Sequence, residues 1–192
     1  WLAYLCCGRR LARRNNRTLR STRVSRTRSP RPTTAEVLED RTLLSVTTLL
    51  IDGELSVVSD NGESVAIGAD LFSNVEVTVN GVVDTNVGPF AASSIESMIV
   101  EGDDLDNVLD LSGVLSADYT WTDIDGNPMT VDVRGGNGHD TLVGAGDLVS
   151  SLSGGDGDDT ITVLGADGWV DAGDGNDLVV GGDGSDTLSG GD

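Results

Sequence analysis

A nine-residue phrase that recurs in the last third of the chain constrains the fold more than any other feature. It reads Gly-Gly-Asn-Gly-His-Asp-Thr-Leu-Val at residues 135–143. It returns with substitutions at residues 154–162, 172–180 and 181–189, and a further copy begins at residue 190. In each complete copy the sixth residue is Asp and the eighth is apolar, while glycine dominates the first, second and fourth positions. A flexible linker does not require this fixed spacing, so the phrase predicts a regular repeat structure.

The residue types in the phrase suit a calcium ion. Glycine tolerates backbone conformations with positive φ, so the chain can turn tightly and direct several carbonyl oxygens at one point. The sixth-position Asp adds a carboxylate, and calcium takes about six to eight oxygen ligands. The three residues after that Asp read as a very short strand whose middle, apolar side chain points inward.

The phrase resembles the G-G-x-G-x-D-x-U-x nonapeptide of the RTX, or haemolysin-type, calcium-binding proteins. The resemblance covers residues 135–192 and implies a parallel β-roll in which two nonapeptides form one turn, so that residues 18 apart stack. On that basis Asp140, Asp159 and Asp177 fall on one side of the roll. Asp186 falls on the other side, next to degenerate copies that carry Gly168 and Ser150. We therefore expect one calcium-rich side, with an ion shared between the turns of Asp159 and Asp177, and one poorly liganded side.

The predicted cofactor is Ca²⁺, and its predicted ligands share three positions of the repeat and the sixth-position carboxylate. They are Asp140, Asp159, Asp177 and Asp186, with the backbone of Gly135, Gly136, Gly138, Gly154, Gly155, Gly157, Ala172, Gly173, Gly175, Gly181, Gly182 and Gly184. Ala172 stands where the other copies have their first glycine.

The apolar eighth position continues upstream of the strong repeats. Steps of nine residues lead back from Val133 to Ile124 and Leu115, and one extra residue interrupts the spacing near Gly144. Glu101–Leu109 reads as a further degenerate copy, with Asp106 and Val108 at its sixth and eighth positions. The predicted fold class is all-β: a parallel β-roll or β-helix solenoid at residues 108–192, preceded by a β-rich segment at 46–107 with alternating apolar runs between Asx-Gly turns.

Charge divides the chain sharply. Residues 1–41 hold 11 of the 12 basic residues and 3 acidic ones, whereas the remainder holds 29 acidic residues and a single basic one, Arg134. We predict a disordered Arg-rich leader at residues 1–45 and an acidic region that needs cations to offset its self-repulsion. Leu38-Glu-Asp-Arg-Thr-Leu-Leu-Ser45 resembles the leader motif of many large planctomycete surface and secreted proteins, which implies export. Because the chain begins with Trp and stops within a repeat, we also expect it to be part of a longer reading frame.

The sequence offers no catalytic constellation. His139 is its only histidine and occupies a repeat turn, so a two-histidine zinc motif is impossible. It contains no apolar run of about 18 residues, the length a membrane-spanning helix needs. We predict a non-enzymatic, extracellular or cell-surface module, structural or adhesive, that folds on binding calcium ions and meets cell-surface or matrix components. Two alternatives remain: the RTX portion of a larger secreted hydrolase or toxin, and polyanion binding, without nucleic-acid specificity, through the Arg-rich leader.

Overall fold

The computed structural model describes residues 46–119, 122, 131–165 and 167–192. The predicted leader therefore lies outside the described residues. Residues 42–192 form one compact unit, and its described part is almost entirely β. No helix in this part is long and apolar enough to cross a membrane.

The strands run through the whole described chain. They are β1 (Val46–Ile51), β2 (Glu54–Ser59), β3 (Ser64–Ala69), β4 (Val75–Val79), β5 (Val82–Val83), β6 (Ser97–Glu101), β7 (Val108–Asp110), β8 (Val131–Asn137), β9 (Thr141–Val143), β10 (Ser150–Asp156), β11 (Thr160–Thr162), β12 (Gly168–Asp174), β13 (Leu178–Val180) and β14 (Thr187–Ser189), with a short 3₁₀ helix, η1 (Ala92–Ser94), before β6.

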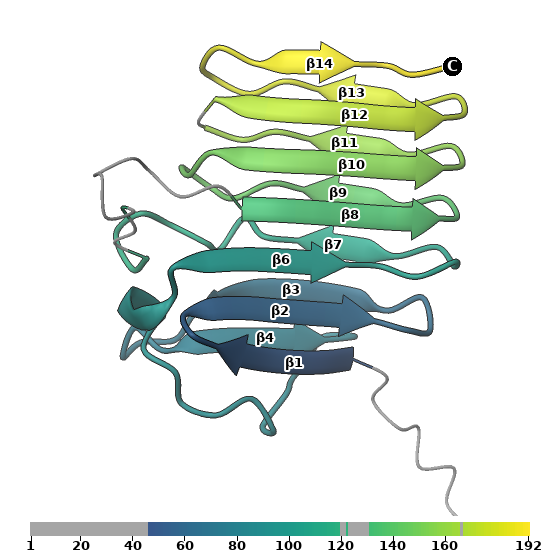
Figure 1. Ribbon diagram of the computed structural model, residues 1–192. Coiled ribbons are helices and arrows are strands. Elements are labelled where there is room, and N and C mark those ends of the chain that lie inside the picture. The colour runs from purple at the N-terminus through teal and green to yellow at the C-terminus, as the bar shows by residue number, and fades with distance from the viewer. Residues whose placement is uncertain (1–45, 120–121, 123–130, 166) are drawn as a thin grey trace, which may run out of the picture. The chain divides into compact units, whose positions relative to one another are not determined.

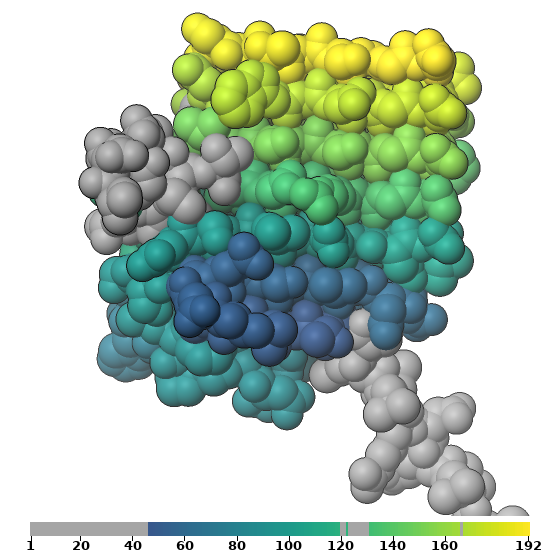
Figure 2. Space-filling model, in the orientation of Figure 1, coloured from purple at the N-terminus to yellow at the C-terminus, as the bar shows by residue number. Residues whose placement is uncertain are grey.

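These strands form two mixed sheets of seven strands each. One has the order β1-β2-β6-β8-β10-β12-β14 and the other β13-β11-β9-β7-β3-β4-β5. From β6 onward, successive strands alternate between the sheets and pair in parallel with the strands before and after them in the same sheet (Figure 1). Each passage through both sheets therefore lies on the preceding one, and Figure 2 shows these layers as successive bands.

The pairing of the strong repeats follows the spacing of the sequence. Ser150 of β10 pairs with Gly168 of β12, 18 residues on, and with Val131 of β8, 19 residues back. The extra residue falls between Leu142 and Leu152, the stretch in which the sequence placed it. Eighth-position side chains face the space between the sheets, where they are buried: Val133, Leu142, Leu152, Ile161 and Val170. Leu188 in the last strand is 47% exposed.

Upstream of Val131 the step of nine residues fails. Leu115, predicted to point inward, is 39% exposed and lies outside the strands, while Ile124 lies outside the described residues. The chain leaves the sheets after Asp110, so the coil below β8 and β9 is 33 residues away and consists of β6 and β7. Leu109, not Val108, pairs with Leu142, so the degenerate copy starts at Gly102 and was predicted one residue out of register.

The N-terminal part closes one end of the stack with antiparallel strands. β1 pairs with β2, and β4 pairs with both β3 and β5. Because β2 and β3 also pair in parallel with β6 and β7, the predicted β-rich segment and the repeats share both sheets. The core between the sheets is almost wholly aliphatic. Its one buried aromatic side chain among the described residues, Tyr119, donates its hydroxyl to the carbonyl of Gly68 at 2.6 Å.

Candidate metal centre

The first half of each repeat forms the turn that leads from one sheet to the other. The second and fourth glycines have positive φ, for example 116° at Gly155 and 138° at Gly157. They also allow close stacking, because a Cβ on Gly155 would lie 1.9 Å from the carbonyl oxygen of Gly136. The first glycine differs from the prediction: Gly135 and Gly154 are not among the residues with positive φ. Their lack of a side chain leaves space in front of an aspartate.

The sixth-position aspartates form a column along one side of the stack. The backbone N–H of Asn107 donates to Oδ1 of Asp140 at 2.8 Å, and that of Asp140 donates to Oδ1 of Asp159 at the same distance. The N–H of Asp159 donates in turn to Oδ1 of Asp177 at 2.8 Å. One oxygen of each carboxylate therefore ties its coil to the preceding one, and the structure brings together the three aspartates that the 18-residue spacing predicted on one side.

The second oxygen of each carboxylate is left without a partner. Oδ2 of Asp140, Asp159 and Asp177 is buried and receives no hydrogen bond from any described residue. Asp140 and Asp159 are only 1% and 2% exposed. A buried polar atom without a partner costs about 1–3 kcal/mol, and more when it is charged. Such atoms are rare in folded proteins, so three in one column point to a ligand that satisfies them.

Backbone carbonyls of the next coil share the space that these oxygens face. A Cβ on Gly135 would lie 2.2 Å from Oδ2 of Asp140 and 2.6 Å from the carbonyl oxygen of Gly154. A Cβ on Gly154 would lie 2.2 Å from Oδ2 of Asp159 and 2.3 Å from the carbonyl oxygen of Ala172. We call these two spaces the Asp140 cradle and the Asp159 cradle. In each, a carboxylate oxygen and a carbonyl oxygen converge at distances close to those of calcium–oxygen bonds, about 2.3–2.6 Å.

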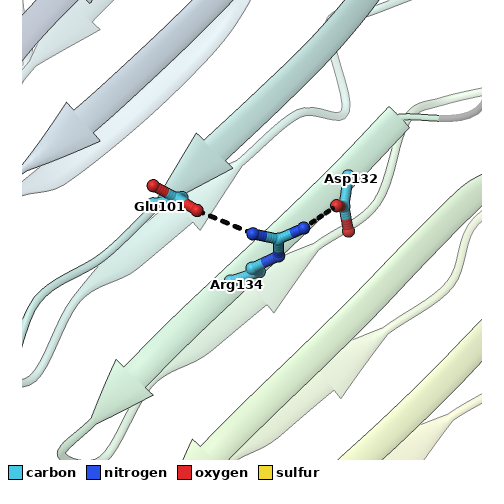
Figure 3. Close-up of polar contacts among 3 residues, drawn as sticks. All are labelled: Glu101, Asp132 and Arg134. Carbon is cyan, nitrogen blue, oxygen red and sulfur yellow. Dashed lines mark hydrogen bonds and ion pairs between the residues drawn. The ribbon is translucent and has the colours of Figure 1, made fainter.

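The electrostatics of the column favour a cation. Burial raises the pKa of Asp140 to about 6, and burial followed by the charge of Asp177 raises the pKa of Asp159. Both shifts mean that the surroundings oppose the ionised carboxylate. The nearest arginine cannot offset this charge: Arg134 is the sole basic residue after position 41, and its guanidinium binds Glu101 at 2.8 Å and also Asp132 on the outer face of the sheet (Figure 3).

The opposite side of the stack carries Asp186. Its Oδ1 accepts the backbone N–H of Gly168 at 3.0 Å, and Gly168 pairs with Ser150. At Ser150 the hydroxyl accepts the N–H of Ala145 at 3.0 Å. A Cβ on Gly181 would lie 2.8 Å from Oδ2 of Asp186 with no carbonyl oxygen among its three nearest atoms. The structure therefore places Asp186 apart from the other three aspartates, with fewer oxygens around it.

His139 takes part in an outer row of hydrogen bonds formed by the fifth positions. Its N–H donates to Asp106 Oδ1, and its exposed ring accepts the N–H of Asp158 at Nδ1, both at 2.8 Å. Asp106, predicted at a sixth position, belongs to this row. The true sixth-position residue of that coil is Asn107.

Sequence reasoning missed the start of the column. Asn107 is followed there by Glu63, whose neighbour Val65 pairs with Leu109. The Oγ of Ser59 lies 2.6 Å from Oε2 of Glu63 and 2.9 Å from Oδ1 of Asn107, and all three residues are buried. Gly102, which corresponds to Gly135, was the signal that could have corrected the register. Counting back by nines from the strong repeats could not, because the excursion after Asp110 breaks the count.

In the described part of the chain, no three His, Cys, Asp or Glu side chains gather as a metal-binding group. A cation in either cradle would thus take most of its ligands from backbone carbonyls. Comparisons of the chain with protein-family models, with curated proteins and with solved structures give no match. The argument for a function therefore rests on the geometry of the column.

Proposed function

We propose that the chain is an exported calcium-binding module in which calcium ions hold together the coils of a parallel β-roll, and that it serves a structural or adhesive role outside the cell. The roll consists of β6 to β14, which alternate between two sheets in successive parallel layers. The ions lie in the turns of the Asp140 and Asp159 cradles.

The column of buried, unpartnered carboxylate oxygens carries this proposal. Each faces a carbonyl oxygen of the next coil, and no described hydrogen-bond donor reaches it. Oxygen-only surroundings of this kind suit a hard cation. Calcium fits better than magnesium because it accepts irregular sets of six to eight oxygens at longer distances, whereas magnesium requires a compact octahedron and gives up its water reluctantly.

Calcium matters most for the C-terminal coils. Around the antiparallel end, Leu55, Val77, Ile95 and Met98 are fully or almost fully buried. From β9 onward each three-residue strand contributes one inward side chain, as in Thr160–Thr162, so little apolar area offsets an ordering cost of about 1–2 kcal/mol per residue. A site present only in the folded state adds about 2.7 kcal/mol of stability when the ion is at 100 times its Kd. The coils therefore depend on calcium, while the N-terminal end has a core of its own.

Export fits this division. Extracellular calcium modules bind with Kd values of about 10⁻⁴–10⁻³ M, so coils of this kind stay loose at low cytosolic calcium and become ordered outside. The Leu38–Ser45 motif resembles an export leader, which supports the same location.

Limited proteolysis with and without calcium tests the proposal. We expect calcium, but not an equal concentration of magnesium, to protect the segment 131–192, while part of the segment 46–119 resists cleavage in chelator as well. Circular dichroism and isothermal titration calorimetry on the same samples should show a gain of β signal with saturable calcium binding. Identical cleavage and spectra in calcium and in chelator, with no binding heat, would overturn the proposal.

A further inference from the structure

The column contains more sixth-position residues than cradles, and the residues at its two ends differ from the rest. Asn107 replaces the aspartate at one end. Ala172 replaces the first glycine in the coil of Asp177 at the other end. Between them lie the Asp140 and Asp159 cradles, each with an unpartnered carboxylate oxygen and an open glycine. The nonapeptide pattern alone counts Asp177 as a ligand like the other two and does not weigh these two replacements.

At the first end, the side-chain amide of Asn107 occupies the position of the metal-facing oxygen. A Cβ on Gly102 would lie 2.9 Å from Nδ2 of Asn107 and 2.1 Å from the carbonyl oxygen of Gly135. Nδ2 donates to Oδ1 of Asp103 at 2.9 Å and to the carbonyl oxygen of Leu105 at 2.5 Å. A polarised N–H group therefore meets the oxygens that a cation would otherwise bind, so this coil satisfies them without a metal.

At the other end, a methyl group occupies the space. β10 and β12 pair in register, so Ala172 lies beside Gly154, and Leu178 pairs with Thr160, so Asp177 lies beside Asp159. The Cβ of Ala172 thus takes the position that is open above Gly135 and Gly154, and Ala172 is fully buried. Its carbonyl still faces the Asp159 cradle. Asp177 keeps its Oδ1 bond to the N–H of Asp159 but has no open space for an ion.

We propose that Asn107 and Ala172 set the metal capacity of the column: two calcium ions bind, at the Asp140 and Asp159 cradles, and both ends are closed to metal by these two side chains. This inference rests on the proposed function, since it assumes that the cradles bind calcium. Asp177 is then a positioning residue, which orients Asp159 through its backbone and is not a metal ligand.

Calcium stoichiometry of folded variants tests the inference. Asn107→Asp places a carboxylate among the oxygens of Asp103, Leu105 and Gly135, so it should raise the stoichiometry from two to three. Ala172→Gly opens the space in front of Asp177 and should also raise it from two to three. The matched controls are Asn176→Asp, which adds the same charge at an exposed turn position, and Ala66→Gly in β3; both should stay at two.

Loss of sites locates the two ions. Asp140→Asn and Asp159→Asn should each remove one ion. Asp177→Asn should remove none from the wild-type chain but should cancel the gain in the Ala172→Gly background. The stoichiometry is measured by calorimetry and by equilibrium dialysis at saturating calcium, where the circular dichroism spectrum confirms that each variant is folded. A variant that folds in neither condition is replaced at the same end by Asn107→Glu or Ala172→Ser, for which we expect three ions and two ions.

The outcomes separate this inference from the proposed function. A wild-type chain that binds no calcium overturns the proposed function and the inference with it. A wild-type chain that binds calcium, but in a number other than two, overturns the inference alone. So does an unchanged stoichiometry in Asn107→Asp for the first end, or in Ala172→Gly for the other. A loss of one ion in Asp177→Asn would show that Asp177 is a ligand after all.

Discussion

Replacing Asp159 by Asn should stabilise the metal-free protein and weaken its response to calcium. The substitution keeps a carbonyl-type oxygen that can accept the N–H of Asp140. It replaces the unpartnered Oδ2 by an amide group near the carbonyl oxygen of Ala172. Both atoms lie within 2.3 Å of one point above Gly154, so a small rotation lets the amide donate to that carbonyl. Asn107 occupies the equivalent position with its amide nitrogen bonded to oxygens.

The magnitudes follow from the two states of the cradle. Without metal, the variant no longer buries an unpartnered acceptor, which costs about 1–3 kcal/mol, and it gains a hydrogen bond worth about 0.5–1.5 kcal/mol. We expect a net stabilisation of about 1–3 kcal/mol, at roughly 2–4 °C of melting temperature per kcal/mol. In calcium at ten to a hundred times Kd, the lost site removes about 1.4–2.7 kcal/mol from the calcium-induced gain.

Thermal and urea unfolding in chelator and in about 10 mM calcium, well above the expected Kd, measure both effects. The control is Asp171→Asn, which removes the same charge from an exposed residue on the neighbouring strand β12 and should leave the calcium increment unchanged. The reasoning is refuted if Asp159→Asn is less stable than the wild type in chelator, or if its stability rises with calcium as much as that of Asp171→Asn.

Three further predictions concern the same unit. Gly154→Ala should cost about 1–3 kcal/mol and one calcium ion, because its Cβ would lie 2.2 Å from Oδ2 of Asp159; Gly190→Ala, whose Cβ meets nothing within 4 Å, is the control, and equal unfolding midpoints would contradict the steric argument. The raised pKa of Asp140, about 6, means that the metal-free fold binds a proton more tightly than the unfolded chain does, so its stability should increase as the pH falls from 7.5 to 5 and calcium affinity should decrease; in Asp140→Asn, titrations at the two pH values should differ less. Arg134→Ala should cost less than about 1 kcal/mol, since the guanidinium is 52% exposed; a larger loss in urea unfolding would show that its ion pairs with Glu101 and Asp132 matter more than solvent screening allows.

The strong repeats could be aligned from the sequence because their spacing is itself the structural period. Backbone stacking forces Gly157 to lie against Gly138, with 1.8 Å between a Cβ on the former and the carbonyl oxygen of the latter. A side chain at such a position is excluded, so the sequence preserves glycine there and reveals the register. The same reasoning placed Asp140, Asp159 and Asp177 on one side and Asp186 on the other.

The upstream coil could not be aligned in this way, because its partner residues are 33 positions away. The excursion after Asp110 is folded by contacts that no repeat encodes: the hydroxyl of Tyr119 reaches the carbonyl of Gly68, and Leu111 and Val114 are buried. A count by nines passes through this segment without sensing it. The antiparallel end, in which β1 covers β2 and β4 lies beside β3, likewise depends on pairings between segments that share no motif.

The two ends of the aspartate column explain why calcium dependence is graded along the chain. Toward the N-terminus, the column changes from ionised aspartates to Asn107 and then to Glu63, which lies in a buried network with Ser59 and the N–H of Asn61. The same direction leads into the largest part of the aliphatic core. Polar groups that hydrogen bonds satisfy need no ion, and coils next to a preformed core need less added stability. The end that folds without metal therefore offers a paired edge, β6 and β7, on which the calcium-dependent coils can assemble one after another.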